Sequence, residues 1–402
     1  MKLDDHLRAL VDAAAASGLL RSPSTYDGPV SHPQLAGRTH VSFASNDYLG
    51  LAAHPRLRES LSQAAAQLGG PASSRVVAGT SSAHRCAEAA LAAHAGHADA
   101  RVFSSAYAAN VAVLGSLLGP PDLILSDELN HASIIDGCRL SRARVMVYRH
   151  ADPDHLAWLL RQHAASARVT AVVTESVFSM DADVADVEVL RRLTDEHGAA
   201  LVVDEAHAFG VVGARGEGVC GSRGIAADVV VGGLGKAFGL AGGFVAGSAA
   251  LTRAIDNVAR PFLFSTAMLP AVAATIPLAT ELLRGASTER ARVLSHVAMI
   301  RDAAAGLGWR ALGSPLAPIV PVVVGTPQAA VELSQALRAR GFLVPVMRPP
   351  TVPVGTSRMR WSATAVHTEH EVRAACDAFG ELAAQTLPAD RQRDHQASAA
   401  QG

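Results

Sequence analysis

Lys236 is the residue whose surroundings point most strongly to chemistry. It lies in VVVGGLGKAFGLAGG, where nearly every neighbour is apolar or glycine. Burial disfavours the charged ammonium and lowers its pKa, which makes the amine a better nucleophile toward an aldehyde. The alternative is an exposed lysine in a turn. The glycines argue against it, because they let the backbone approach a ligand closely.

Two phosphate-binding motifs compete for the same segment, and neither fits. A P-loop requires glycine five residues before its Gly-Lys pair and Ser or Thr after it, but Val230 and Ala237 occupy these positions. A dinucleotide fingerprint also fails, because one residue too many separates the second glycine from Gly239. The segment therefore favours a covalent role for the lysine.

Polar residues follow two other apolar runs. Asp204 ends LVVD and His207 comes three residues later, while Glu175, Ser179 and Asp181 lie in TESVFSMDAD. If the aldehyde that Lys236 attacks belongs to a cofactor with a pyridine ring, Asp204 would pair with the protonated nitrogen of that ring and keep the ring electron-poor. His207 would then bind the phenolic oxygen of the same ring. Ser179 would touch the same ring. The alternatives are a cap or structural ion pair for Asp204 and an ordinary helix cap for Ser179.

Three more segments supply partners for such a cofactor. His131, in SDELNHASIIDG, would stack on a planar ring and act as an acid, although one of 17 histidines is often satisfied locally. The turn that opens a helix at Ala106 and Tyr107 would offer free N–H groups to a phosphate. Arg358 and Arg360 alternate along SRMRWS and so share one face, where one would clamp a carboxylate. The alternative for them is a solvated edge strand.

The elements that must position these residues repeat one order: a short apolar, β-branched run, a turn, then a helical pattern. This order predicts an α/β fold with a mainly parallel sheet covered on both faces, in which ligands lie beyond the carboxyl ends of the strands. The density of polar motifs drops after about residue 275. We therefore expect an N-terminal helix and arm at 1–45, a large cofactor-binding domain at 46–275, a smaller α+β domain at 276–385 and a disordered tail at 386–402.

Composition excludes several classes of protein. The net charge is −1 and no long basic run appears, which argues against a nucleic-acid partner. The longest low-charge window, 229–251, contains Lys236 and seven glycines, so no membrane span is expected. Four cysteines without a CxxC pair predict neither a metal cluster nor disulfides. The N-terminus is not a secretory signal, so a cytoplasmic location is expected.

Taken in order, these segments closely resemble the α-oxoamine synthases, a branch of the fold-type I pyridoxal-phosphate enzymes. The resemblance runs from about Arg21 to Ala384. It is carried by SNDYLGL, SSAYAAN, NHASIIDG, TESVFSMDAD, VVDEAHAFG, GLGKAFG, RPFLFSTAMLP and RPPTVPVGTSRMR. It implies a large domain built on a seven-stranded sheet, a homodimer with active sites at the subunit interface, and pyridoxal phosphate as the cofactor.

The resemblance also assigns roles to residues. It implies that Lys236, His131 and Asp204 are catalytic. The cofactor would be contacted by Ala106, Tyr107, His131, Ser179, Asp204, His207, Gly233 and Lys236, with Thr266 contributed by a partner subunit. The substrates would be contacted by Arg21, Asn46, Thr351 and Arg360. Two positions depart from the family, which usually has Gly at 106 and Thr at 233, and the loss of the threonine hydroxyl removes one phosphate contact.

The NDYLG start and PPTVPVGTSRMR are most similar to the branch of the family that serves biotin biosynthesis. The expected reaction is the decarboxylative condensation of L-alanine with a pimeloyl thioester, carried by CoA or by an acyl carrier protein. The alternative is glycine C-acetyltransferase chemistry or another acyl donor. A catalytically silent subunit is disfavoured because Lys236 is present, and a dehydrogenase is disfavoured because its phosphate fingerprint is missing.

Overall fold

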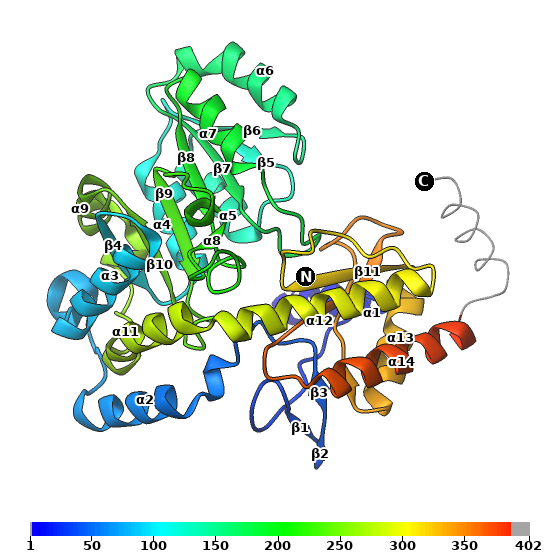
Figure 1. Ribbon diagram of the computed structural model, residues 1–402. Helices are drawn as coiled ribbons and strands as arrows, with labels where there is room; N and C mark the ends of the chain where they lie inside the picture. The colour runs from blue at the N-terminus through cyan, green and yellow to red at the C-terminus, as the bar shows by residue number, and fades with distance from the viewer. Residues whose placement is uncertain (1, 387–402) are drawn as a thin grey trace.

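A seven-stranded sheet forms the centre of the molecule (Figure 1). The computed structural model describes residues 2–386. In spatial order the strands are β4 (Asp99–Phe103), β10 (Gly243–Gly247), β9 (Val229–Gly233), β8 (Ala200–Asp204), β7 (Thr170–Glu175), β5 (Leu123–Asp127) and β6 (Arg144–Tyr148). The pairs from β9 to β6 are parallel, and only β10 runs against both of its neighbours. The predicted mainly parallel sheet is confirmed.

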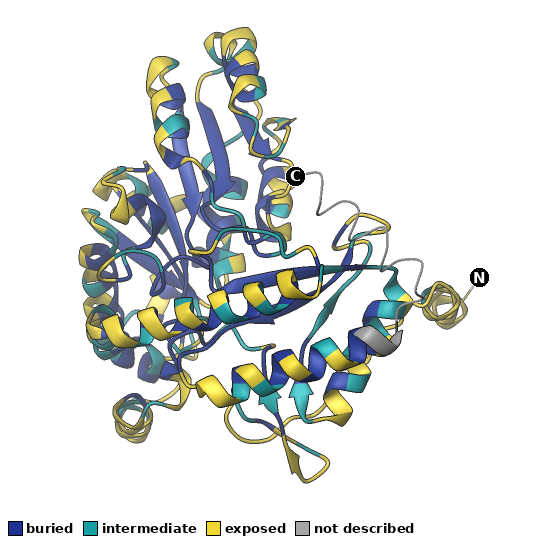
Figure 2. Cartoon of the chain, turned by 45° about the vertical axis from the view of Figure 1, so that its right-hand side comes forward, coloured by how far each residue is buried: buried dark blue, intermediate teal, exposed yellow. Residues whose placement is uncertain are grey.

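Helices cover both faces of this sheet and bury its apolar strands (Figure 2). One face packs against α4 (Ala106–Leu117), α5 (Ala132–Ser141), α9 (Ala249–Val258) and α10 (Arg260–Leu263). The other packs against α3 (Ser82–Ala95), α6 (Pro153–His163), α7 (Val187–Glu196) and α11 (Pro270–Gly285). Helix α2 (Pro55–Gln67) packs on α11, and the short α8 (Gly218–Ser222) follows β8. Burial on both faces explains why the strands read as continuous apolar runs rather than as alternating ones.

A second, smaller sheet lies in the C-terminal part of the chain. Its antiparallel order is β11 (Ile319–Gly325), β14 (Ser357–Ser362) and β13 (Val346–Met347), and it packs with α12 (Ser287–Gly306), α13 (Pro327–Ala339) and α14 (Glu369–Thr386). Because β14 is the central strand, Arg358 and Arg360 are buried. The alternative reading of these arginines as part of a solvated edge strand is therefore wrong.

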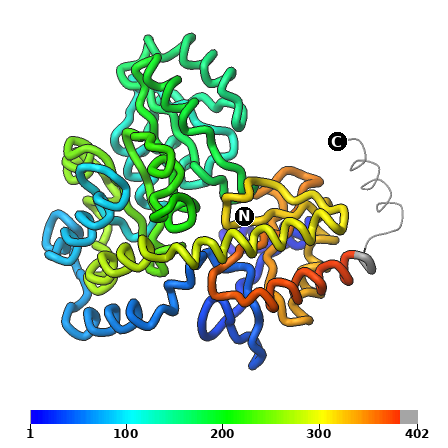
Figure 3. Tube along the Cα trace, in the orientation of Figure 1, coloured from blue at the N-terminus to red at the C-terminus, as the bar shows by residue number. Residues whose placement is uncertain are grey.

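The N-terminal segment lies against this smaller part of the molecule (Figure 3). Strand β3 (Val41–Ser42) pairs in parallel with β12 (Phe342–Leu343), and β1 (Gln34–Leu35) forms a hairpin with β2 (Arg38–Thr39). The predicted N-terminal helix is α1 (Leu3–Ala16). Short 3-10 turns occur at η1 (Leu51–Ala53) and η3 (Ala164–Ser166), and η2 (Arg75–Gly79) is a single π turn.

The predicted domain boundaries stay predictions. Helix α11 runs across the one placed after residue 275. The predicted tail, 386–402, lies outside the described residues except for Thr386, the last residue of α14. Within residues 2–386, no helix is long and apolar enough to cross a membrane, and no cluster of three or more His, Cys, Asp or Glu side chains could hold a metal ion.

Candidate active site

The carboxyl ends of β7, β8 and β9 bring three of the singled-out residues together. Glu175 and Asp204 are register partners at the ends of adjacent strands, and Lys236 follows β9 after a short turn. The turn requires Gly239, since its φ is +67° and a Cβ there would lie 2.4 Å from the backbone nitrogen of Ala52. Parallel strands that end at one edge thus place an amine beside two carboxyl groups.

Lys236 is poised to lose its proton. Burial lowers its pKa from 10.5 to about 8, while Asp204 and Glu175 oppose the shift and Arg360 adds to it. The direction agrees with the sequence prediction. Burial also raises the pKa of Glu175 to about 8, with Asp204 adding to the shift, so this carboxyl group binds a proton far more readily than an exposed one. The Oε1 atom of Glu175 is buried and has no hydrogen-bond partner in the described part of the chain.

Asp204 is held from two sides by neutral donors. Its Oδ2 accepts from Asn110 Nδ2 at 2.7 Å, and its Oδ1 accepts from the N–H of Ala206 at 2.8 Å. The residue is only 7% exposed and forms no ion pair with any described residue. A buried carboxylate without a cation is costly, and a protonated ring nitrogen would supply the missing charge.

The start of α4 forms a cradle for an anion. Ser105 caps the helix by accepting from Ala108 N, while the N–H groups of Ala106 and Tyr107 have no acceptor among residues 2–386. Strand β10 approaches so closely that a Cβ on Gly243 would lie 2.4 Å from the nitrogen of Ala106. Free N–H groups at a helix start fit a phosphate.

His131 caps the start of α5 and presents its ring beside this cradle. Its Nδ1 accepts from the N–H of Ser133 at 3.2 Å and lies 2.8 Å from Ser133 Oγ. The ring packs edge-on to that of Tyr107, with centroids 6.5 Å apart. His131 is exposed, so a face of the ring is free to stack on a planar ligand.

His207 follows the end of β8 by three residues and is buried. Its Nδ1 is 2.7 Å from Tyr48 Oη, which also donates to Asn46 Oδ1 at 3.2 Å. Burial, with Lys236 and Arg360 adding to it, moves the pKa of His207 well below 6.5, so the ring is neutral. Neutral imidazole and phenol groups suit a contact with a ring oxygen.

The two arginines of β14 share one face, as their spacing predicts, but they have different partners. Arg358 forms an ion pair with Asp181. Arg360 donates from Nε to the Ser179 carbonyl at 2.8 Å and from Nη1 to Asn46 Oδ1 at 3.3 Å. It has no carboxylate partner among the described residues and is 5% exposed. A buried, unpaired guanidinium is suited to receive a carboxylate from a substrate.

The loop that carries Ser179 is also fixed from the sheet edge. His150 lies between two carboxylates, with Nδ1 2.8 Å from Asp127 Oδ1 and Nε2 2.9 Å from Asp183 Oδ2. Although burial alone would lower the pKa of His150, its hydrogen bonds and ion pairs to these two residues raise it to about 10. The charged imidazole therefore links Asp183, in the loop after Ser179, to Asp127 at the end of β5.

Three predicted site residues are not brought to Lys236. Arg21 and Thr351 lie in two segments that Arg348 connects. Its side chain donates to the Leu20 carbonyl at 2.7 Å, and its own carbonyl accepts from Thr351 N at 3.1 Å. Thr266 is exposed and forms an isolated bridge with Ser74. Their assigned contacts stay predictions.

Sequence reasoning missed several residues of the site. Tyr48, Asn110 and Ser133 are buried and hydrogen-bonded to predicted site residues. A signal existed for Asn110, since it follows Ala106 by four residues and so lies one helical turn further along the same face of α4. Nothing local indicated that its partner lies 94 residues away.

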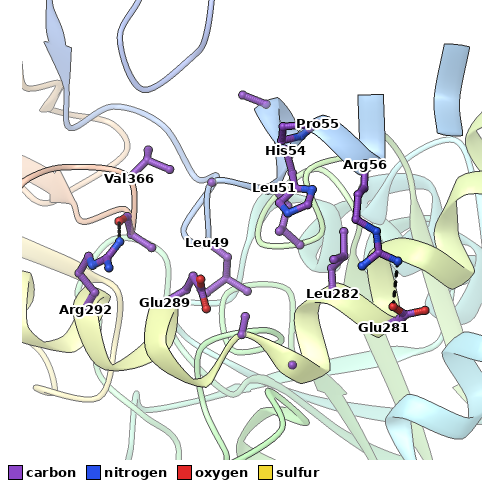
Figure 4. Close-up of a pocket in the computed structure, with 15 residues that line it drawn as sticks. Leu49, Leu51, His54, Pro55, Arg56, Glu281, Leu282, Glu289, Arg292 and Val366 are labelled. Carbon is purple, nitrogen blue, oxygen red and sulfur yellow. Dashed lines mark hydrogen bonds and ion pairs between the residues drawn. The ribbon is translucent and has the colours of Figure 1, made fainter. Parts of the chain in front are cut away.

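Lys236 lines a cavity of about 430 Å³ that extends toward the N-terminal arm. Its other walls include Tyr26, Val30, Leu240 and Leu343. A separate cavity of about 620 Å³ lies between η1 and the junction of α11 with α12, beside the ion pair of Arg56 with Glu281 (Figure 4). None of the predicted site residues lines this second cavity.

These observations fit a flat, phosphorylated pyridine aldehyde. The amine, the uncompensated carboxylate, the open ring face of His131 and the free helix N–H groups match its aldehyde, ring nitrogen, ring plane and phosphate, respectively. Positions 106 and 233 face each other in this cradle, since a Cβ on Gly233 would lie 3.8 Å from that of Ala106.

Comparisons with known proteins agree with this reading. The family model for aminotransferase class I and II matches residues 38–379. An 8-amino-7-oxononanoate synthase from Anaeromyxobacter sp. (strain K) is 43% identical over 394 residues, which cover 97% of this chain and 98% of that protein. A serine palmitoyltransferase from Sphingomonas wittichii superposes with a TM-score of 0.89 at 30% identity, covering 96% of this chain and 98% of that one. Another, from S. paucimobilis with bound PLP–myriocin aldimine, gives a TM-score of 0.89 at 28% identity over 95% and 98% of the two chains.

Proposed function

Because this chain belongs to the aminotransferase class I and II family and, within it, to the α-oxoamine synthases, we propose that it performs the reaction of the 8-amino-7-oxononanoate synthases. The enzyme is a pyridoxal-phosphate-dependent acyltransferase of biotin biosynthesis. It condenses L-alanine with a pimeloyl thioester and releases carbon dioxide and the thiol carrier. The observation that carries the proposal is the buried Arg360, which has no carboxylate partner in the described chain and lies close enough to Lys236 to lower the pKa of its amine.

When bound, pyridoxal phosphate supplies the electron sink that allows an amino acid to lose its Cα proton. Asp204 holds a proton at the ring nitrogen, because its carboxylate has neutral donors but no cation of its own. Lys236 would hold the cofactor through its aldehyde carbon, and after the amino group of the substrate displaces it, the freed Nζ would take the Cα proton and return it. A pKa of about 8 leaves part of the amine neutral near physiological pH.

Two other side chains handle the substrates. Arg360 receives the alanine carboxylate and keeps it in place until it leaves as carbon dioxide. His131 has its Nδ1 occupied by Ser133, so the proton on Nε2 is available to the thioester carbonyl oxygen. Burial keeps His207 neutral, which suits a hydrogen bond to the ring oxygen of the cofactor.

The cavity beside Lys236 has room for a long acyl chain. Its volume is about 430 Å³, and its walls include the apolar side chains of Val30, Leu240 and Leu343. A pimeloyl donor is compatible with this space, and a panel of substrates decides between pimeloyl and acetyl donors.

The proposal includes a homodimer in which Thr266 reaches the phosphate of the partner subunit. It is supported by exposed apolar side chains around Thr266, with Phe264 at 72% and Val77 at 81% exposure. It also includes a cytoplasmic location, which is supported by four cysteines that are all unpaired.

A substrate panel tests the proposal. Purified protein with pyridoxal phosphate receives L-alanine or glycine, each with pimeloyl-CoA, a pimeloyl carrier protein or acetyl-CoA, and the products are identified by mass. We expect product from L-alanine with a pimeloyl donor. Product from glycine and acetyl-CoA alone would refute the proposal.

A second experiment tests the covalent site. The chain has only two lysines, Lys2 and Lys236, so borohydride reduction of the loaded enzyme gives an unambiguous peptide map. The cofactor mass should appear on Lys236, and Lys236→Ala should lose both the label and turnover. Labelling of Lys2 alone would contradict the assignment.

A further inference from the structure

Asn110 is a buried polar residue of α4 that has no role in the mechanism above. It is 2% exposed, and its amide nitrogen makes two hydrogen bonds: one to Asp204 Oδ2 at 2.7 Å and one to Ser133 Oγ at 2.9 Å. An amide nitrogen has two hydrogens, so both are used. The carboxylate fixes the orientation of the amide, because the opposite orientation would bring two acceptor oxygens together.

Ser133 connects Asn110 to His131, because its hydroxyl contacts both side chains. Because the N–H of Ser133 donates to His131 Nδ1, this ring nitrogen is an acceptor, and the Ser133 hydroxyl, 2.8 Å away, can donate its one hydrogen to it while accepting from Asn110. The N–H of Ser133 donates to the same ring nitrogen at 3.2 Å. An Nδ1 that accepts twice leaves the neutral ring with its proton on Nε2. Desolvation lowers the pKa of His131, and Lys236 adds to the shift although Asp204 opposes it, in agreement with a neutral ring.

We infer that Asn110 is a positioning residue that couples two groups of the site. It orients the Asp204 carboxylate and, through Ser133, holds the His131 proton on Nε2. The chain of contacts runs from β8 through α4 to the start of α5, and every member except His131 is buried. The inference rests on the proposed function, which gives Asp204 and His131 their partners in the reaction.

The network has two arms: the hydrogen bond of Asn110 to Asp204, and the contacts from Asn110 through Ser133 to His131. Substitutions can test the two arms separately. Asn110→Leu removes both hydrogen bonds of the amide, whereas Ser133→Ala removes only the hydroxyl contact to His131 and keeps the backbone N–H of residue 133 on Nδ1. Ser133→Thr keeps the hydroxyl and serves as the rescue. Thr275→Val is the matched control, because Thr275 is a fully buried hydroxyl in α11 whose hydrogen bond, to the Ala271 carbonyl at 2.9 Å, stays within its own helix.

The first readout is the affinity of the full-length protein for pyridoxal phosphate, measured by absorbance titration. Loss of a hydrogen bond to a charged group predicts an affinity about 10- to 100-fold weaker for Asn110→Leu. Ser133→Ala and Thr275→Val should change this affinity less than about threefold.

The second readout is the tautomer of His131 in the loaded enzyme, measured by ¹⁵N NMR. Its signal is identified as the one that disappears in His131→Gln. Asn110→Leu and Ser133→Ala should both raise the population of the Nδ1–H form and the pKa of His131 relative to wild type, although the N–H of residue 133 still donates to Nδ1. Ser133→Thr and Thr275→Val should keep the wild-type tautomer ratio and pKa.

The outcomes are decisive in each case. If neither the tautomer ratio nor the pKa of His131 changes in Ser133→Ala, the inference is overturned, even if Asn110→Leu does not fold. Unchanged cofactor affinity in a folded Asn110→Leu overturns the Asp204 arm. Failure of the wild-type protein to bind the cofactor would instead refute the proposed function, so the two failures are distinguishable.

Discussion

Replacing Arg360 by lysine should weaken the recognition of a carboxylate and of nothing else in the amino acid. The guanidinium donates from Nε to the Ser179 carbonyl and from Nη1 to Asn46 and Ser362, and no carboxylate neutralises it in the described chain. Lysine keeps the charge but loses the planar fork. The loss of one charge-assisted hydrogen bond costs about 1.5–3 kcal/mol, which corresponds to roughly 10- to 100-fold in affinity.

The assay compares two ligands on two proteins. L-Alanine and L-alaninamide, which lacks the carboxylate, are titrated into the loaded wild-type and Arg360→Lys enzymes without a thioester, and binding is followed by cofactor absorbance. Any general damage to the site affects both ligands, so it cancels in the ratio of their dissociation constants. The preference for alanine over alaninamide should fall about 10- to 100-fold in the variant.

A control variant sharpens this comparison. Arg358→Lys changes the neighbouring arginine on the same face of β14, which is already paired with Asp181. It should leave the ligand preference unchanged even where overall affinity drops. The reasoning is refuted if the preference survives in Arg360→Lys, or if Arg358→Lys reduces it equally.

Three further perturbations follow from the same geometry. The rate at which pyridoxal phosphate bonds to the cofactor-free protein should rise with pH through about 8, the pKa of Lys236; a flat stopped-flow profile from pH 7 to 9 would contradict this. Gly243→Ala should abolish cofactor binding and lower the melting temperature, because its Cβ would lie 2.4 Å from the nitrogen of Ala106, whereas Gly285→Ala, with no atom within 4 Å, should be neutral in the same melts. The folded pKa of His150, about 10, exceeds its ordinary 6.5, so its contribution is complete below about pH 6.5 and lost toward pH 10. The stability advantage of wild type over His150→Gln should therefore shrink by a few kcal/mol across that range in denaturant titrations, and a constant difference would count against the clamp.

The sequence was informative wherever one strand or one turn decides the chemistry. Asp204 and Glu175 could be placed at a ligand-binding edge because apolar runs of strand length end at them, and parallel strands end together. The lowered pKa of Lys236 followed from its apolar, glycine-rich neighbours. Such predictions need only the local pattern and the rule that parallel sheets are buried on both faces.

The sequence was not informative where the role of a residue depends on a side-chain partner that is distant in the sequence. Alternation places Arg358 and Arg360 on one face, and only the contact of Arg358 with Asp181, 177 residues away, shows which guanidinium remains unpaired. The hydrogen bond of Asn110 to Asp204 joins two elements on different layers for the same reason. Local pattern cannot reveal such pairs, because side-chain partners are chosen by the packing of whole elements.

The two departures from the family pattern illustrate how such packing acts on the cofactor site. A side chain on residue 233 would place its Cβ 3.2 Å from that of Ala206 and 3.8 Å from that of Ala106. The first distance is tight and the second is an ordinary van der Waals contact, so the Cβ of a threonine at 233 would press on Ala206 and not on the methyl group of Ala106. In the proposed function, the phosphate would be held by the N–H groups of Ala106 and Tyr107, which have no acceptor in the described chain, since Gly233 offers no hydroxyl.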